Sequence, residues 1–178
     1  MAGREATAFI QYIVNATVKD TTTGVRLSVP EAEESVSGEY RFNVSGIGDL
    51  QCDRVLPFVG TLSTSGTADL DFAGAVDDSI GQSVTMTEIC AIMVRNRTTT
   101  AGAVLRVGGT GGGAPLAGLF GATNDYINVG PGGIMLWVSP NDGQGVPVTA
   151  TTADILRLTN ASGSSTLSYE VLVLGRSA

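Results

Sequence analysis

The sequence predicts an all-β protein, built as a β-sandwich or barrel, on three observations. Apolar and polar residues alternate with a period of two in most segments, as they do in half-buried strands. Turn-forming clusters separate these segments, and 24 of the 178 residues are glycine, against a usual share of roughly 7 %. No segment carries a sustained apolar stripe at helical spacing. Many short strands separated in this way are typical of sandwiches and barrels.

The first expected strand, Thr7 to Lys19, is the longest alternating run in the chain. One face of it carries Ala8, Ile10, Tyr12, Val14, Ala16 and Val18. Phe9 and Ile13 add apolar side chains to the other face, which is otherwise polar. The same alternation predicts strands at 25–29 and 40–45, with Pro30 to Gly38 as an acidic loop between them.

The later strands follow one another between turn sequences and bring the total to about ten. They are expected at Ala68–Phe72, Glu88–Asn96, Ala103–Val107, Ile127–Val129, Ile134–Ser139, Ile155–Thr159 and Leu167–Leu174. The intervening sequences at 98–102, 108–113, 130–133, 140–143 and 160–165 are rich in Gly, Pro, Asn, Ser and Thr, which favour turns. Leu116 to Phe120 is expected to form a single helical turn.

Charge divides the chain into two parts. Residues 1–78 contain 12 acidic and 5 basic residues, whereas residues 79–178 contain 5 of each. A Thr/Ser-rich boundary at 61–66 then predicts N-terminal strands or an arm at 1–60 and a β-sandwich domain at 61–178. The alternative is one continuous domain over 1–178. The low charge of the second part indicates either packing between subunits or outer faces covered by hydroxyl groups.

Composition excludes several classes of function. The chain has no histidine, which removes Ser-His-Asp catalysis and His-ligated zinc. A net charge of −7 argues against nucleic acid as a partner. The longest apolar run, Ile89 to Val94, is too short to span a bilayer, so neither membrane anchoring nor export is expected. Cys52 and Cys90 follow no metal-binding spacing and are expected to be buried free thiols, with a disulfide as the alternative.

The sequence motifs that resemble chemical sites are weak, and we expect no catalytic residue, no cofactor and no metal. The segment Gly109 to Ala114 fits a dinucleotide-binding pattern, but no helix is expected after it. Asp69, Asp71, Asp77 and Asp78 are close in sequence, yet a solvent-exposed strand end explains them better than a calcium or acid–base site. The glycosylation sequons at Asn15, Asn43, Asn96 and Asn160 are attributed to composition.

Candidate interaction residues come from the first strand and from the single tryptophan. A strand that only closes a sandwich needs one apolar face, whereas the first strand has apolar residues on both. It is therefore expected to lie between its own domain and another subunit, with coverage of a loop of the same chain as the alternative. The candidates are Phe9, Ile10, Tyr12, Ile13, Val14 and Trp137; for Trp137, core packing is the alternative to an interface role.

The C-terminal half resembles a family of known proteins. The resemblance rests on Ala101 to Gly109, Val129 to Gly133, Val148 to Ala150 with Ala153 to Asn160, and Tyr169 to Gly175. Together these segments look like a small virion structural protein of tailed bacteriophages, most similar to capsid decoration (cement) proteins with a jelly-roll-like β-sandwich. The likeness covers about residues 70–175, and the first 60 residues lie outside it as an N-terminal extension.

The resemblance implies a non-enzymatic protein on the outside of a virion capsid, assembled in the cytoplasm of a bacterial host. The implied partners are the major capsid protein and further copies of the chain, with a trimer favoured and a dimer as the alternative. Another virion component, such as a tail, baseplate or head-fibre protein, would share this fold. A carbohydrate-binding β-sandwich is the rival from a different class, and it would need an exposed aromatic platform. A hydrolase with paired acids is a more distant alternative.

Overall fold

The structure is a computed structural model that describes residues 7–18, 32–43, 46–74, 76–77, 83–109 and 114–177. These residues are almost entirely in β-strands and turns, which confirms the all-β prediction. In chain order the elements are β1 (Thr7–Val18), β2 (Ala32–Asn43), β3 (Arg54–Leu62), β4 (Thr67–Asp71), β5 (Val76–Asp77), β6 (Ser83–Val84), β7 (Glu88–Asn96), β8 (Leu105–Gly108), α1 (Ala117–Phe120), β9 (Tyr126–Val129), β10 (Ile134–Val138), β11 (Val146–Pro147), β12 (Ile155–Asn160) and β13 (Leu167–Arg176).

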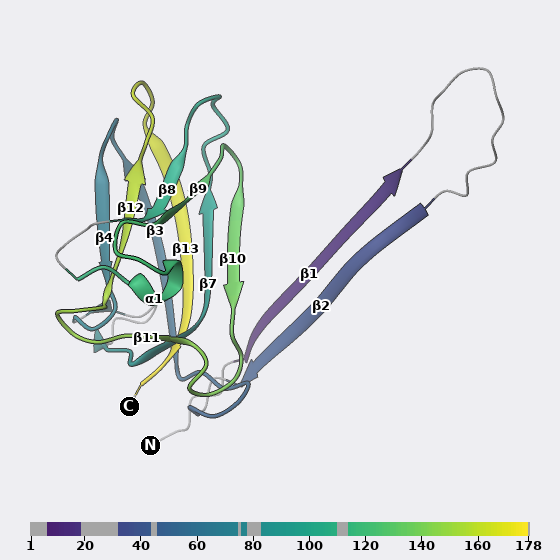
Figure 1. Ribbon diagram of the computed structural model, residues 1–178, viewed down its shortest axis with the longest axis vertical. Helices are drawn as coiled ribbons and strands as arrows, with labels where there is room; N and C mark the ends of the chain where they lie inside the picture. Colours follow the sequence, from purple (N-terminus) through teal and green to yellow (C-terminus); the bar gives the residue numbers. More distant parts are fainter. Residues whose placement is uncertain are drawn as a thin grey trace.

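Two antiparallel sheets pack face to face, and a hairpin projects from one side of them (Figure 1). The sheet nearer the hairpin has the order β10-β7-β13-β3, with the short strand β11 alongside β7; we call it the arm-side sheet. The second sheet has the order β4-β12-β8-β9, and we call it the opposite sheet. Strands β1 and β2 form the hairpin, which we call the arm. Strands β5 and β6 pair only with each other among the described residues.

The strand order is that of a jelly roll. Strand β3 pairs with β13, β4 with β12, β7 with β10 and β8 with β9, so the pairs are nested from the outside inward. The chain also changes between the two sheets from β3 to β4, β4 to β7, β7 to β8, β9 to β10, β11 to β12 and β12 to β13. A long hairpin rolled up on itself gives this arrangement. The jelly-roll-like sandwich expected from the family resemblance is therefore what the chain forms.

The main core fills the space between the two sheets. Alternate residues of each strand point into it, so that β12 buries Leu156 and Leu158 completely or nearly so. Phe72 is fully buried and meets Phe58 edge-on, with 6.2 Å between the ring centroids. Burial of each such side chain stabilises the fold by about 1.5–3 kcal/mol. This core depends on both sheets, which makes the sandwich one cooperative unit.

Two buried asparagines join the loops at one end of the sandwich. Asn96, the last residue of β7, shares its amide hydrogens among the carbonyl oxygens of Ala103, Val129 and Gly130, at 2.8–3.2 Å. Asn160, the last residue of β12, contacts the carbonyls of Leu62, Ser63 and Ser165 at 2.7–3.3 Å. Each asparagine thus ties a loop next to its own strand to a loop that is distant in sequence.

The same two asparagines belong to sequons, and the structure gives the motif a mechanical role. The side-chain oxygen of Asn96 accepts a hydrogen bond from the backbone N–H of Thr98, and that of Asn160 accepts one from Ser162. Both asparagines are fully or almost fully buried. A folded chain therefore presents neither side chain for glycosylation, and the Asn-x-Ser/Thr pattern here marks an Asx turn.

Three local expectations differ from the structure. Strand β2 begins at Ala32, inside the segment expected as an acidic loop, because each residue from Ala32 to Gly38 pairs with β1. Strand β3 was not predicted, because Pro57 and Gly60 interrupt its pattern. Its pairing with β13 uses residues that the sequence analysis assigned to the N-terminal arm. The strand expected at 25–29 lies outside the described residues, whereas the helical turn near Leu116 is present as α1.

Candidate functional site

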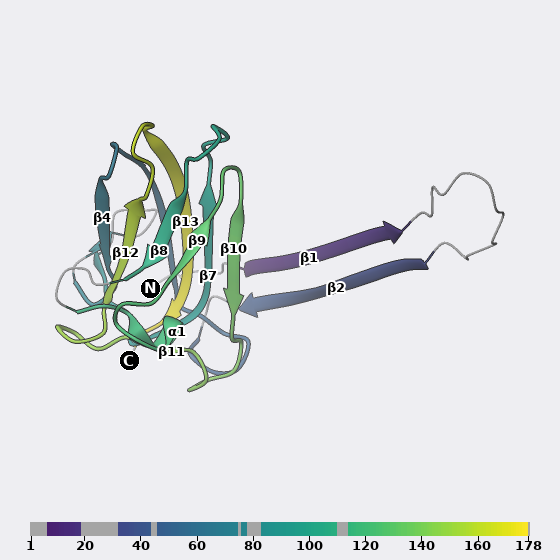
Figure 2. The same cartoon turned by 45° about the horizontal axis from the view of Figure 1, so that its top comes forward.

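The arm is a regular antiparallel hairpin that leaves the sandwich beside β10 (Figures 1 and 2). Its register pairs every residue of β1 with one of β2, from Thr7 opposite Asn43 to Val18 opposite Ala32. Tyr12 lies across Gly38, where an added Cβ would stand 2.4 Å from the tyrosine oxygen. An aromatic ring laid over a strand glycine covers backbone that would otherwise be exposed. The arm therefore has a defined packing face near its root.

The root of the arm packs on the outer face of the arm-side sheet and forms a second, smaller core. Phe42 of the arm is fully buried there, and Ala8, Ile10 and Tyr40 pack around it. The sheet contributes one cross-strand row, which we call the first row. In register order the first row consists of Val138, Ala91, Leu174 and Val55. Ala91 and Leu174 are buried beneath the arm.

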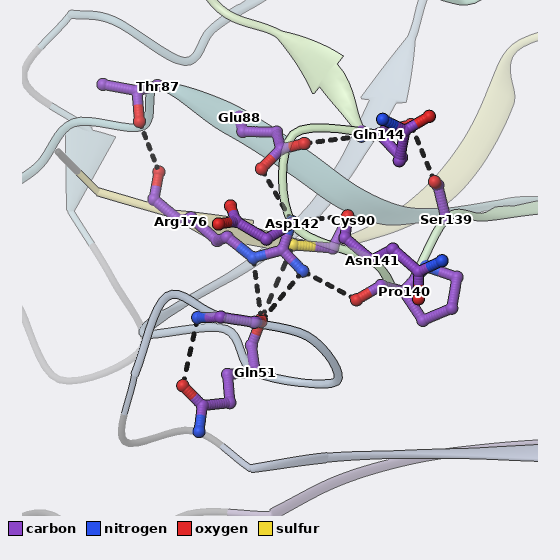
Figure 3. A network of polar contacts seen from close by, with 12 residues as sticks. Gln51, Thr87, Glu88, Cys90, Ser139, Pro140, Asn141, Asp142, Gln144 and Arg176 are labelled. Atoms are coloured by element: carbon purple, nitrogen blue, oxygen red, sulfur yellow. Dashed lines mark hydrogen bonds and ion pairs between the residues drawn. The ribbon is translucent and has the colours of Figure 1, made fainter.

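A buried arginine anchors the loops at this root (Figure 3). Arg176 is only 1 % exposed and forms an ion pair with Glu88 at 2.6 Å. Its remaining donors reach backbone carbonyls in two loops, those of Gly48 and Gln51 before β3 and those of Pro140 and Asn141 after β10, at 2.7–3.2 Å. We call these contacts the Arg176 cluster. It ties the segment that connects the arm to β3 against the body of the protein.

Two further rows of the arm-side sheet lie on the same outer face, beyond the arm root. The second row consists of Leu136, Met93, Leu172 and Pro57, and the third row of Ile134, Arg95, Glu170 and Val59. Leu136 is 41 % exposed, Ile134 61 % and Val59 71 %. Arg95 and the neighbouring Arg97 share the carboxylate of Glu170, at 3.7 and 3.1 Å. The sheet thus presents an apolar band with a basic rim.

The outer face of the opposite sheet has a different character. Asp69 on β4 forms a bidentate ion pair with Arg157 on β12, in which both nitrogen–oxygen distances are 2.7 Å. This carboxylate raises the pKa of Arg157 above its usual value. Arg106 of β8 and Asn128 of β9 lie in register on that face. That outer face is therefore mainly polar, with Tyr126 exposed on it, whereas the outer face of the arm-side sheet carries the apolar first and second rows.

The six sequence candidates lie in different environments. Phe9 is 49 % exposed on the arm face away from the body, where the Arg41 guanidinium stacks 5.1 Å from its ring centroid. Ile10 and Tyr12 lie on the opposite face of the arm, and Ile10 packs at the root. Ile13 and Val14 belong to β1, but their side chains lie outside the description. Trp137 points inward from β10 and packs against the main core, whereas its neighbour Leu136 points outward.

Two of the aspartates that resembled a chemical site, Asp69 and Asp71, serve local structure. Asp71 accepts hydrogen bonds from the backbone N–H groups of Ala73 and Gly74, which closes the turn after β4. Asp142 donates its backbone N–H to Asp49, so the Asn141-Asp142-Gly143 segment is a turn held to a neighbouring loop. Among the described residues, no three acidic or thiol side chains lie together as metal ligands would.

A shallow hollow of about 590 Å³ opens between α1 and β9. It is lined by Leu119, Phe120, Asn124, Asp125, Tyr126 and Ile127. Tyr126 is 45 % exposed, and the Arg106 guanidinium lies 4.0 Å from its ring centroid. The aromatic ring with nearby amide and carboxylate groups is the kind of surface on which a sugar ring stacks.

No protein-family model matches the chain, and no curated protein matches its sequence. Within the part of the chain that the structure describes, no helix is long and apolar enough to cross a membrane. The site is therefore interpreted from its own residues: the arm, its root and the open rows of the arm-side sheet.

The open rows were not among the predicted interaction surfaces, although the sequence contains a signal for them. Strands β7 and β13 each contain four or more consecutive apolar residues, at 89–94 and 171–174. In an antiparallel sandwich, such a run places apolar side chains on the solvent face as well as in the core. The same argument that singled out β1 applies to these two strands. What the sequence does not reveal is the register that aligns them into rows.

The two cysteines lie in the second core and are free thiols, as expected from the sequence. Burial raises the pKa of Cys52 to about 11 and that of Cys90 to about 12, while the nearby Arg176 acts in the opposite direction. In the unfolded chain both thiols ionise at lower pH than in the folded chain. The unfolded state then binds fewer protons, so the folded state loses stability as pH rises.

We therefore expect the stability contributed by these neutral thiols to be complete below about pH 9 and to disappear as pH rises through about 11 to 12. Urea unfolding at about pH 8 and about pH 10.5 measures the change in the free energy of unfolding. The Cys52→Ala/Cys90→Ala double variant should lose less stability between the two pH values than the parent protein. An identical loss in both proteins would show that other groups cause the alkaline destabilisation.

Proposed function

We propose that this protein is a non-enzymatic virion structural protein that binds the outside of a phage capsid and stabilises the shell as a decoration protein. The observation that carries the proposal is the arm: a two-stranded extension anchored at its root and projecting from a jelly-roll body (Figure 2). Twelve residues of β-strand span about 40 Å, long enough to reach a neighbouring molecule. A cement protein needs such an element because it must contact more than one subunit.

The surface of the body supports the same function. Asp69 and Asp71, which were candidates for acid–base chemistry, are held in an ion pair and in a turn, respectively. The arm-side sheet, in contrast, keeps apolar rows at its outer face. Many copies of a modest contact, summed over a particle, stabilise a shell strongly. In this proposal the major capsid protein is one partner, and the protein is located on the exterior of the virion.

The test uses particles made from the genome that encodes this chain. An arm-shortened variant replaces residues 13–37 by Asn-Gly, which joins Tyr12 to Gly38 through a two-residue turn and keeps the root residues. Particles assembled with the intact chain should carry it on the outer capsid surface in electron micrographs, and particles assembled with the shortened chain should lose it. A matched melting temperature for the two purified proteins shows that the sandwich is intact.

Two results would overturn the proposal. The intact chain could be absent from purified particles, or it could lie in the tail or baseplate, which would make it a different virion component. Alternatively, the arm-shortened chain could bind capsids as well as the intact chain does, in which case the arm is not the attachment element.

The hollow beside Tyr126 favours a second candidate function, carbohydrate binding. Tyr126 supplies the exposed aromatic platform that this rival requires, and Asn124 and Asp125 supply hydrogen-bonding groups. Screening the purified protein against bacterial surface glycans tests this function. Binding that disappears in Tyr126→Ala would support it, and retention of every glycan signal in that variant would exclude the hollow as the binding site.

A further inference from the structure

We propose that the open rows of the arm-side sheet are the docking site for the outer half of the arm of a second copy of this chain. The arm and the sheet already form one such contact within the chain. There, Ala8 and Ile10 of the arm cover the first row, where Ala91 and Leu174 are buried. The second and third rows continue the same sheet face without a described segment over them.

The arm likewise continues beyond the part that the chain uses itself. Strand β1 runs without interruption from the root to Val18. After Ala8, Ile10 and Tyr12, its sequence keeps apolar residues at every second position, with Val14, Ala16 and Val18. In a continuous strand these positions share the face that packs at the root. The arm and the sheet therefore each have a contact surface of which only the part at the root is covered within the chain.

The chain cannot bring its own unused halves together. The arm leaves the sandwich as a paired hairpin and points away from the arm-side sheet (Figures 1 and 2). Its root is fixed by Phe42 and by the neighbouring Arg176 cluster. To lie over the second row of its own sheet, the outer half would have to bend sharply away from the direction in which the paired strands leave the root (Figures 1 and 2). A second molecule can fill the open rows without such a bend.

Charge favours a second copy of this chain as that molecule. Residues 31–37, which lead into and form the outer half of β2, contain three glutamates and no basic residue. Glu39 lies nearer the root and is paired with Arg41 at 2.8 Å. The rim of the open rows carries Arg95 and Arg97, which share one carboxylate, Glu170. An acidic arm laid across the apolar band brings its charges toward this basic rim. The outer half of the arm and the open rows are thus complementary in both hydrophobicity and charge.

The contact has a direction, because the arm of one copy meets the sheet of the next. Copies joined head to tail in this way form a closed ring. If two copies each place their arm on the other's sheet, they form a dimer. This inference does not depend on capsid binding, since the purified protein alone provides both surfaces. Its failure would therefore leave the decoration function open, and failure of that function would leave this inference intact.

The first part of the test compares the oligomeric state of three purified proteins by sedimentation velocity at micromolar concentration. Leu136→Glu places a negative charge on the second row, at an exposed position of an edge strand. Asn128→Glu is the matched control, because it adds the same charge to an exposed position on the edge strand of the opposite sheet. We expect the intact protein and the control to be oligomers. In Leu136→Glu, the dissociation constant of the oligomer should rise at least tenfold.

The second part identifies the two surfaces that meet. The arm-shortened variant described above keeps the open rows but lacks the outer arm, whereas Leu136→Glu keeps the arm but has an impaired sheet. Each should sediment as a monomer alone, and a mixture of the two should form a one-to-one complex. That complex requires the intact arm of the Leu136→Glu protein and the unaltered open rows of the arm-shortened protein. Contact between two sheet faces would not produce it.

Each remaining outcome overturns the inference. A monomeric intact protein would show that the open rows bind no second copy. An arm-shortened protein that stays oligomeric would show that another surface makes the contact. Two monomeric variants that fail to combine would show that the arm and the open rows do not meet between copies.

Discussion

Replacing Arg176 by methionine should lower the free energy of unfolding by about 3–5 kcal/mol. The change leaves the Glu88 carboxylate partly buried without its 2.6 Å partner. It also removes one hydrogen-bond donor from each of the carbonyls of Gly48, Gln51, Pro140 and Asn141. Unpaired buried polar groups cost far more than the net value of the contacts in the intact protein.

Urea unfolding followed by the fluorescence of the single tryptophan measures this loss, because Trp137 packs against the main core. The Arg176→Met/Glu88→Met double variant is the matched control: it removes the unpaired charge and should be more stable than Arg176→Met alone. A loss below about 1 kcal/mol in the single variant would mean that water replaces the arginine at the arm root.

Replacing Asn160 by alanine should cost about 3 kcal/mol, the second largest effect that we expect. The substitution leaves the carbonyls of Leu62, Ser63 and Ser165 without the amide donor that now joins them. It also removes the acceptor for the Ser162 backbone N–H. Asn96→Ala should give a similar loss, since its contacts have the same form.

The exposed Asn128 provides the control for both asparagines, and Asn128→Ala should change the free energy of unfolding by less than about 0.5 kcal/mol. The double variant Asn96→Ala/Asn160→Ala should lose the sum of the two single effects, because the residues tie different pairs of loops. Equal stability of Asn160→Ala and Asn128→Ala would show that the buried amide is not what holds these loops.

Local patterns in the sequence were sufficient to predict most strands but not their arrangement. Apolar and polar residues alternate along β1 and β12, as they do in a strand with one buried face, and the structure contains both strands. The first half of β2 was missed because Glu33 and Glu34 make it resemble a loop. Its pairing with β1 depends on a second segment and cannot be read from β2 alone. The proline and glycine of β3 similarly hide a strand that the neighbouring β13 holds in place.

The site depended even more on contacts between distant residues. Arg176 lies 128 positions from Gly48, whose carbonyl it binds, and 88 positions from Glu88. Nothing within a short window of the sequence distinguishes it from a surface arginine. The open rows likewise use one residue from each of four strands, so they follow from register. The apolar residues were visible in the sequence, but their common surface was not.

The nested strand pairing also sets the order in which the surfaces proposed above for assembly are completed. Strand β13 lies between β7 and β3, and during synthesis it is made after both of them. It supplies Leu172 to the second row and Leu174 to the first, together with Arg176 of the arm root. Pairing over such long separations makes folding slow compared with that of helical proteins. A nascent chain that has not yet reached β13 has the arm sequence, but it has neither the seat for the arm root nor complete open rows. The association between copies proposed above would therefore be disfavoured until β13 has been made.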